Sequence, residues 1–118
     1  MIIFHNTRCS KSREALDLLE KGNCEIEIRD YLNLPPSKKE LKEILTMLKC
    51  KPIDIVRKNE SLYLEKYAGK KITDAKWLEI LNKNPILIER PIVIDGEKAV
   101  IGRPPKLVID LIKKKKKK

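Results

Sequence analysis

The first thirty residues switch between two hydrophobic periodicities, and this switch constrains the fold more than any other stretch. Residues 1–4 form an apolar run, which predicts a short buried strand. Residues 15–19 carry apolar side chains at helical spacing, and the Gly-Asn pair at 22–23 ends that pattern. Residues 24–30 alternate apolar and charged side chains, which predicts a half-buried strand. A strand, a helix and a strand of these lengths form a right-handed βαβ unit with two parallel strands.

A cysteine lies where the first strand passes into the helix. Cys9 is surrounded by polar and basic residues, including Arg8, Lys11 and Arg13. Most free cysteines are buried and unreactive, but these neighbours make a poor core environment. The N–H groups at a helix N-terminus favour a negative charge, and nearby cations lower the pKa of a cysteine. We therefore predict that Cys9 is a nucleophile directed at an anion.

The rest of the chain adds a helical segment and a hairpin. Ser37 and Glu40 form the pattern of a capping box before a helix, and residues 51–84 read as short helices, the last one capped by Thr73 or Asp74. Two apolar runs around Asp95-Gly96 predict a β-hairpin over 91–101, followed by a turn and a final amphipathic helix. This order predicts an α/β, thioredoxin-like mixed four-stranded sheet with flanking helices and a helical insert.

The length of 118 residues suits one domain. We expect a single domain over residues 1–112, with the helical insert at about 37–84, and a disordered Lys tail at 113–118, because a block of like charges repels itself. The tail accounts for six units of the +10 net charge. Since the remainder has no face that combines aromatic and basic residues, we expect no nucleic-acid binding.

Several classes of protein are not indicated. No apolar run is long enough for a membrane span, and no signal-peptide pattern is visible, so we expect a cytoplasmic protein and a monomer. Cys24 and Cys50 read as packing residues, since no pair of cysteines has C-x-x-C spacing. With one histidine and no G-x-G-x-x-G, we expect no bound metal or cofactor.

Arginines could complete an anion site, because a guanidinium offers two donors in a fixed fork. Arg90 directly precedes Pro91, where a cis bond would bring the backbone close to the cysteine, and Arg103 lies between Gly102 and two prolines. Arg57 follows an apolar run in the insert, a context more typical of a surface charge. We predict that Arg90 and Arg103 are substrate-binding residues.

Two further side chains are candidates for the site. His5 could end the first strand facing the thiolate and stabilise it, or point to solvent. Ser12 makes the segment a C-x-x-S, and its hydroxyl can donate a hydrogen bond to a thiolate or a bound anion. Because serine cannot resolve an adduct on Cys9, we expect an outside thiol to do so.

Four blocks together resemble the ArsC family, and more narrowly the glutaredoxin-linked arsenate reductases. They are residues 5–13 (HNTRCSKSR), Tyr31-Leu32 before Pro35-Pro36, residues 84–93 (NPILIERPIV) and residues 102–105 (GRPP). The resemblance implies a thioredoxin-like oxidoreductase that reduces arsenate to arsenite in arsenic detoxification, with glutathione as co-substrate and glutaredoxin as partner. It implies Cys9 as the nucleophile, His5 as the residue that stabilises its thiolate and Ser12 as the serine of the loop. Arg57, Arg90 and Arg103 correspond to the arginines that bind the oxyanion.

Three alternatives stay open. The first is a transcriptional regulator resembling Spx, which binds RNA polymerase; Ser12 stands where such regulators typically carry a second cysteine. The second is an ArsC-like thiol reductase with another substrate, since one fold hosts different chemistries. The third, a phosphatase-like arsenate reductase, requires a C-x5-R loop, whereas the nearest downstream arginine is Arg13 at C-x3-R spacing.

Overall fold

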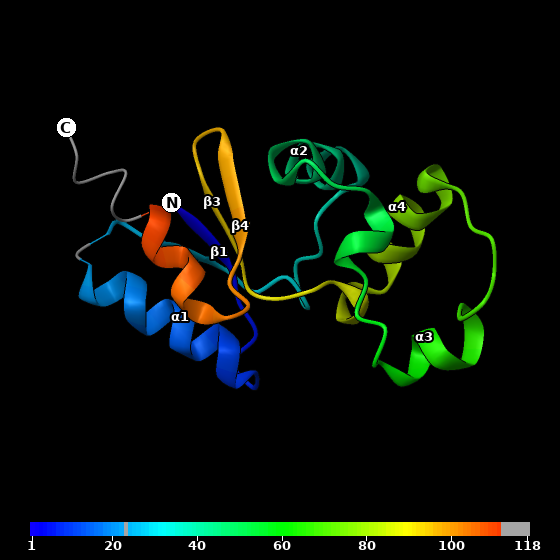
Figure 1. Ribbon diagram of the computed structural model, residues 1–118, viewed down its shortest axis with the longest axis horizontal. Coiled ribbons are helices and arrows are strands. Elements are labelled where there is room, and N and C mark those ends of the chain that lie inside the picture. The colour runs from blue at the N-terminus through cyan, green and yellow to red at the C-terminus, as the bar shows by residue number, and fades with distance from the viewer. Residues whose placement is uncertain (23, 112–118) are drawn as a thin grey trace. The chain divides into compact units, whose positions relative to one another are not determined.

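The computed structural model describes residues 1–22 and 24–111, and these divide into two compact units. The sheet unit comprises residues 1–31 and the described residues from 90 onward. The helical unit comprises residues 32–89. Figure 1 labels the helices and strands of both units. The predicted helical insert lies within the helical unit, and the predicted Lys tail lies outside the described residues.

The described strands of the sheet unit form one four-stranded mixed sheet in the order β2-β1-β3-β4. β1 (Ile2–Phe4) pairs in parallel with β2 (Glu27–Arg29) and antiparallel with β3 (Ile92–Asp95). β3 in turn pairs antiparallel with β4 (Lys98–Ile101). The predicted βαβ unit and hairpin are therefore confirmed, and the fold is thioredoxin-like.

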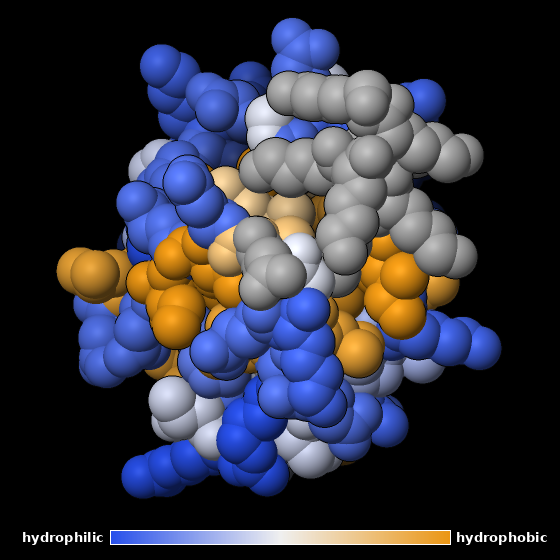
Figure 2. Space-filling view, turned by 90° about the vertical axis from the view of Figure 1, so that its left-hand side faces the viewer, coloured by the Kyte–Doolittle hydropathy of each residue, from blue (hydrophilic) through white to orange (hydrophobic). Residues whose placement is uncertain are grey.

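A hydrophobic core lies between one face of the sheet and two helical segments. α1 (Ser10–Lys21) lies beside the C-terminal segment, a 3₁₀ turn η3 (Pro105–Val108) that continues as helical residues 109–111 (Figure 1). The core consists of Ile3, Ala15, Leu19, Val93, Val108 and Leu111. Part of the surrounding apolar layer is only partly buried, and Figure 2 shows hydrophobic surface between charged side chains. Burial of these side chains fixes α1 against the sheet, and with it the loop that carries Cys9.

β2 is shorter than the predicted strand at 24–30, and Cys24 does not open it. β1 has only three residues and offers β2 only three pairing positions, since the ladder runs from Ile2 opposite Glu27 to Phe4 opposite Arg29.

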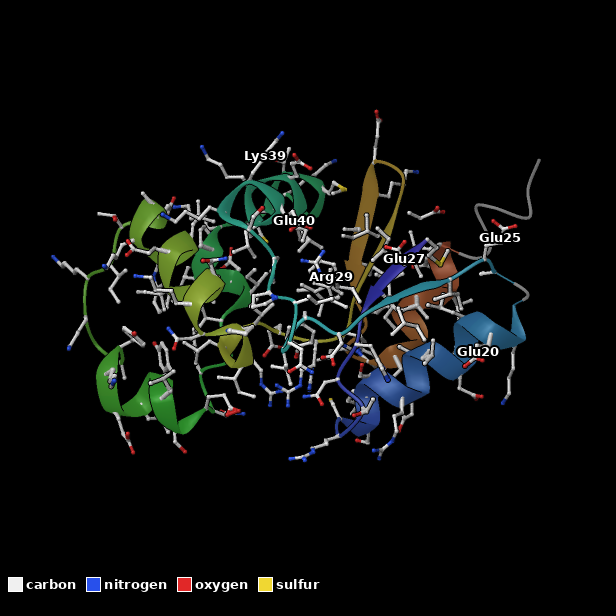
Figure 3. The ribbon with its side chains drawn as sticks, turned by 180° about the vertical axis from the view of Figure 1, so that it is seen from behind. Glu20, Glu25, Glu27, Arg29, Lys39 and Glu40 are labelled. Atoms are coloured by element: carbon white, nitrogen blue, oxygen red, sulfur yellow. The ribbon has the colours of Figure 1, made fainter. Side chains whose placement is uncertain are left out.

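The guanidinium carbon of Arg29, labelled in Figure 3, lies 5.4 Å from the centroid of the Phe4 ring. The predicted burial pattern also fails at Ile28, which is 54% exposed because β2 is an edge strand.

The hairpin turns at Asp95-Gly96, as predicted. Gly96 has a φ of +62°, the left-handed region that a tight primed turn requires and that glycine adopts without steric cost. Pro91 precedes β3 rather than beginning it. The Arg90–Pro91 and Arg103–Pro104 bonds are both cis.

The helical unit consists of α2 (Lys38–Leu48), α3 (Ser61–Lys66) and α4 (Asp74–Lys83), with the 3₁₀ turns η1 (Pro52–Ile55) and η2 (Pro85–Leu87). The capping box is confirmed: the Glu40 amide donates to Ser37 Oγ, and Glu40, labelled in Figure 3, accepts from the Ser37 amide. Thr73, rather than Asp74, caps α4. α2 ends at Leu48, and Cys50 lies after the helix. Among the described residues, no helix is both long and apolar enough to cross a membrane.

Candidate active site

Cys9 occupies the N-cap position of α1, with φ −95° and ψ 120°. An N-cap side chain normally accepts hydrogen bonds from the amides two and three residues further on. Here those amides belong to Lys11 and Ser12, and the first turn of α1 contains no acidic residue. A thiolate in this position therefore meets the positive end of a helix without a competing carboxylate.

The thiol of Cys9 has a lowered pKa, although its side chain is largely buried. Burial raises the pKa, because a buried thiolate loses its hydration. The Ser12 amide, the Arg90 guanidinium and the Lys11 amide all lower the pKa, and together they outweigh burial. Cys9 is 9% exposed, so the thiolate is both ionisable and reachable.

Two of the predicted arginines lie at this sulfur. Arg103 donates from Nη2 to Cys9 Sγ at 3.6 Å, and from Nε to the main-chain oxygen of Arg90 at 2.7 Å. The Nε and Nη1 atoms of Arg90 are buried and have no hydrogen-bond partner among the described residues. Since an unsatisfied buried donor is costly, these N–H groups favour an anionic ligand.

His5 contacts the side chain of Ser12, and its role toward the Cys9 thiolate stays a prediction. The Nδ1 atom of His5 lies 2.6 Å from Ser12 Oγ, and both side chains are buried. Burial lowers the pKa of His5, Asp30 raises it and Arg13 lowers it, with a net lowering that keeps the imidazole neutral. The Ser12 hydroxyl also accepts a hydrogen bond from the Asn6 amide at 3.0 Å. Ser12 thus presents its main-chain amide to Cys9, while its hydroxyl holds His5 and Asn6.

Arg57 belongs to the helical unit. Its amide donates to the Leu87 carbonyl at 2.7 Å, beside the bridge between Val56 and Ile88. Its Nε lies 4.0 Å from a carboxylate oxygen of Glu89. The role of Arg57 toward Cys9 stays a prediction.

Two polar residues of the Cys9 loop were not predicted as part of the site. Asn6 is 7% exposed, and its Oδ1 accepts a hydrogen bond from the Arg8 amide at 2.9 Å. Arg13 donates from Nη1 to the Thr7 carbonyl at 2.8 Å. The available signal was the Asn residue itself, because Asn often bonds the backbone amide two residues on and begins a turn.

The other cysteines differ from Cys9 in their surroundings. All three cysteines are free. Cys24 packs against the core of the sheet unit. Burial raises the pKa of Cys50, and Asp54 raises it further, so this thiol stays protonated. Within residues 1–22 and 24–111, no group of three or more His, Cys, Asp or Glu side chains could hold a metal ion.

Comparison with known proteins assigns the arrangement to a family. The family model described as "ArsC family" matches residues 4–111. Arsenate reductase of Haemophilus influenzae is 38% identical over 114 residues, covering 95% of this chain and 98% of the relative. Arsenate reductase of Neisseria meningitidis serogroup A is 40% identical over 104 residues, covering 86% and 89%. The solved arsenate reductase from Vibrio cholerae has a TM-score of 0.88 at 38% identity, covering 92% of this chain and 94% of that one.

Proposed function

Because this chain belongs to the ArsC family, we propose that it is an arsenate reductase whose nucleophile is Cys9. The single observation that carries the proposal is the position of the Cys9 sulfur, on the N-cap residue of α1 and 3.6 Å from Nη2 of Arg103. Such a site favours a thiolate and an oxyanion together, because helix amides and guanidinium groups stabilise both charges.

The first step is attack of the Cys9 thiolate on the arsenic of arsenate. A sulfur–arsenic bond forms, an arsenic–oxygen bond breaks and the departing oxygen leaves as water after protonation. Arg103 and Arg90 stabilise the charge on the remaining oxygens, since the buried Nε and Nη1 donors of Arg90 have no partner among the described residues. We assign a third contact to Arg57, from the family resemblance.

The second step is reduction by glutathione. Its thiolate attacks the Cys9 sulfur, a disulfide forms, and the sulfur–arsenic bonding pair leaves with arsenic, which is thereby reduced from arsenic(V) to arsenic(III). Arsenite departs after taking up a proton. A thiol of glutaredoxin then attacks the glutathione sulfur of the mixed disulfide and releases Cys9. Because Ser12 cannot form a disulfide, this chain depends on such outside thiols.

We assign the reaction to the cytoplasm, to a monomer and to a protein without a bound cofactor. The free cysteines support a reducing compartment, where thiols are kept reduced. The two electrons come from the thiols, so the chemistry requires no metal, flavin or nicotinamide on this chain.

The test couples oxidation of NADPH to glutathione reductase, glutathione and glutaredoxin. We expect NADPH oxidation that depends on arsenate, is lost in Cys9→Ser and persists in the matched control Cys24→Ser. Omitting glutaredoxin is expected to slow turnover strongly. Absence of arsenate-dependent oxidation in the wild type, with the thiol shown to be free, would contradict the proposal. Turnover with a different oxidised substrate would indicate another thiol reductase of this family.

A further inference from the structure

Asn6 is a buried polar residue that carries no reacting group and yet forms hydrogen bonds with three residues around the nucleophile. It follows β1 and lies three residues before Cys9. Its side chain and its main chain take part in three hydrogen bonds, to Arg8, Cys9 and Ser12. Asn6 is 7% exposed, so these bonds compete little with water.

The first two of these bonds close a turn directly before the nucleophile. Asn6 Oδ1 accepts from the Arg8 amide at 2.9 Å, and the Asn6 carbonyl accepts from the Cys9 amide at 3.0 Å. This is an Asx turn inside a β-turn, an arrangement that Asn supports better than most residues. Both amides before α1 are thus satisfied within the loop, and the main chain of Cys9 is fixed.

The third bond ties the turn to α1. The Asn6 amide donates to Ser12 Oγ at 3.0 Å, and Ser12 is fully buried in the first turn of the helix. Arg13, one residue further on, donates to the Thr7 carbonyl at 2.8 Å. The loop is therefore tied to the first turn of α1 at two adjacent residues, Asn6 and Thr7.

We propose that Asn6 is a positioning residue whose carboxamide holds Cys9 in the N-cap conformation, so that the sulfur stays at the N-terminus of α1 and within reach of Arg103. Without Oδ1, the Arg8 amide loses its partner and the main chain at Thr7 and Arg8 gains freedom. The sulfur then spends less time at the helix N-terminus, and its ionised form loses stabilisation. The inference extends the proposed function and rests on it only where turnover is measured.

The test compares Asn6→Ala with Asn6→Asp in a Cys24→Ser/Cys50→Ser background, where Cys9 is the remaining thiol. Asp keeps an acceptor oxygen for the Arg8 amide, whereas Ala removes it. The readouts are the pH midpoint of Cys9 alkylation by iodoacetamide, hydrogen exchange at the Arg8 amide and turnover with arsenate. Ser37→Ala is the matched control, because it removes a side-chain acceptor from a backbone amide in the helical unit.

For Asn6→Ala we expect an alkylation midpoint about one pH unit higher, which lowers the ratio of thiolate to thiol at a given pH by about tenfold. We also expect faster exchange at the Arg8 amide and a loss of turnover of similar size. Asn6→Asp is expected to restore protection of that amide and to recover most of the turnover once pH is high enough to ionise the thiol. Ser37→Ala is expected to lower Tm without moving the midpoint.

The inference is overturned if Asn6→Ala lowers Tm but leaves the alkylation midpoint and turnover at wild-type values, because the residue would then be merely structural. It is equally overturned if Asn6→Asp restores the Arg8 amide but not turnover at high pH. A wild-type protein with a low alkylation midpoint and no arsenate-dependent turnover would instead contradict the proposed function, and the alkylation and exchange readouts would still decide the role of Asn6.

Discussion

The guanidinium of Arg103 joins the Cys9 sulfur to the Arg90 carbonyl. Its Nη2 lies 3.6 Å from Cys9 Sγ, while its Nε donates to that carbonyl at 2.7 Å. Two donors on one rigid fork are used for different purposes: Nε fixes the direction of the group, and Nη2 meets the sulfur. A positively charged side chain without the planar guanidinium cannot make both of these contacts.

Arg103→Lys tests whether the fork matters beyond its charge. Lysine keeps the positive charge but cannot make both contacts, so we expect kcat/KM for arsenate to fall by about ten- to a hundredfold, or about 1.4–2.8 kcal/mol. The matched control is Arg29→Lys, since Arg29 is an arginine of β2 that lies over the Phe4 ring. Wild-type kcat/KM in Arg103→Lys, in the coupled assay, would contradict the assigned geometry.

His5 gives stability a pH dependence of known sign. Burial lowers the pKa of His5 in the folded protein, so between the folded pKa and the unfolded value of about 6.5 the unfolded chain binds more protons. The stabilisation is complete above the unfolded pKa and is lost as pH falls through the folded pKa. Asp30 and Arg13, the charged groups that act on His5, change this slope in opposite directions.

The measurement is urea unfolding of the wild type and of His5→Gln between about pH 5.5 and 8. We expect wild-type stability to fall on acidification and the variant, though less stable at neutral pH, to show a flatter profile. Parallel profiles for the two proteins would mean that His5 is solvated rather than held neutral by burial.

Gly102 is required for close packing next to Arg103. A Cβ at this position would lie 2.9 Å from Cγ of Pro91 and 3.2 Å from Cγ1 of Val108. Both neighbours are buried, so we expect Gly102→Ala to lower the free energy of unfolding by about 1–3 kcal/mol and to reduce turnover by displacing Arg103.

Gly69→Ala is the comparison for that variant. Its Cβ would meet nothing within 4 Å, but the φ of +75° is unfavourable for alanine. We expect a loss of about 1 kcal/mol and no change in turnover. If Gly102→Ala and Gly69→Ala have the same free energy of unfolding and the same turnover, the contact between Gly102 and Pro91 does not hold the site in place.

The surface beside Cys9 is basic, because Arg8 and Lys11 are both exposed. Glutathione is an anion, so we expect Arg8→Glu/Lys11→Glu to raise the KM for glutathione roughly two- to fivefold for each reversed charge. We also expect this KM to depend less on salt concentration than in the wild type. Lys38→Glu/Lys39→Glu, in the exposed first turn of α2, is the matched control. A similar rise in the KM for glutathione in both double variants would mean that the net charge of the protein causes the rise, and not the position of Arg8 and Lys11 beside Cys9.

The sequence predicts local features well, because their signals are local. The start of a helix next to Cys9, the box at Ser37 and the turn at Asp95-Gly96 each depend on a few neighbouring residues. The length of β2 was wrong because it depends on β1, a strand distant in sequence. The contact between Arg103 and Cys9 joins residues 94 positions apart, and no local pattern predicts its geometry.

The direction of the Ser12 hydroxyl was also beyond the sequence. A C-x-x-S pattern allows this hydroxyl to face the thiolate, but it bonds His5 Nδ1 and the Asn6 amide instead. Which partner a buried hydroxyl takes depends on the distances between three elements, which no local pattern encodes.

The most direct measurement is titration of the Cys9 thiolate by its ultraviolet absorbance in the Cys24→Ser/Cys50→Ser protein, with Cys9→Ser added as the blank. The amides of α1 and the Arg90 guanidinium lower the pKa of Cys9, so half-ionisation is expected below the value of an ordinary cysteine, about 8.5. Half-ionisation at or above that value in the folded protein would contradict the account, since at most about 3% of the thiol would then be ionised at pH 7 and the site would not stabilise the attacking thiolate.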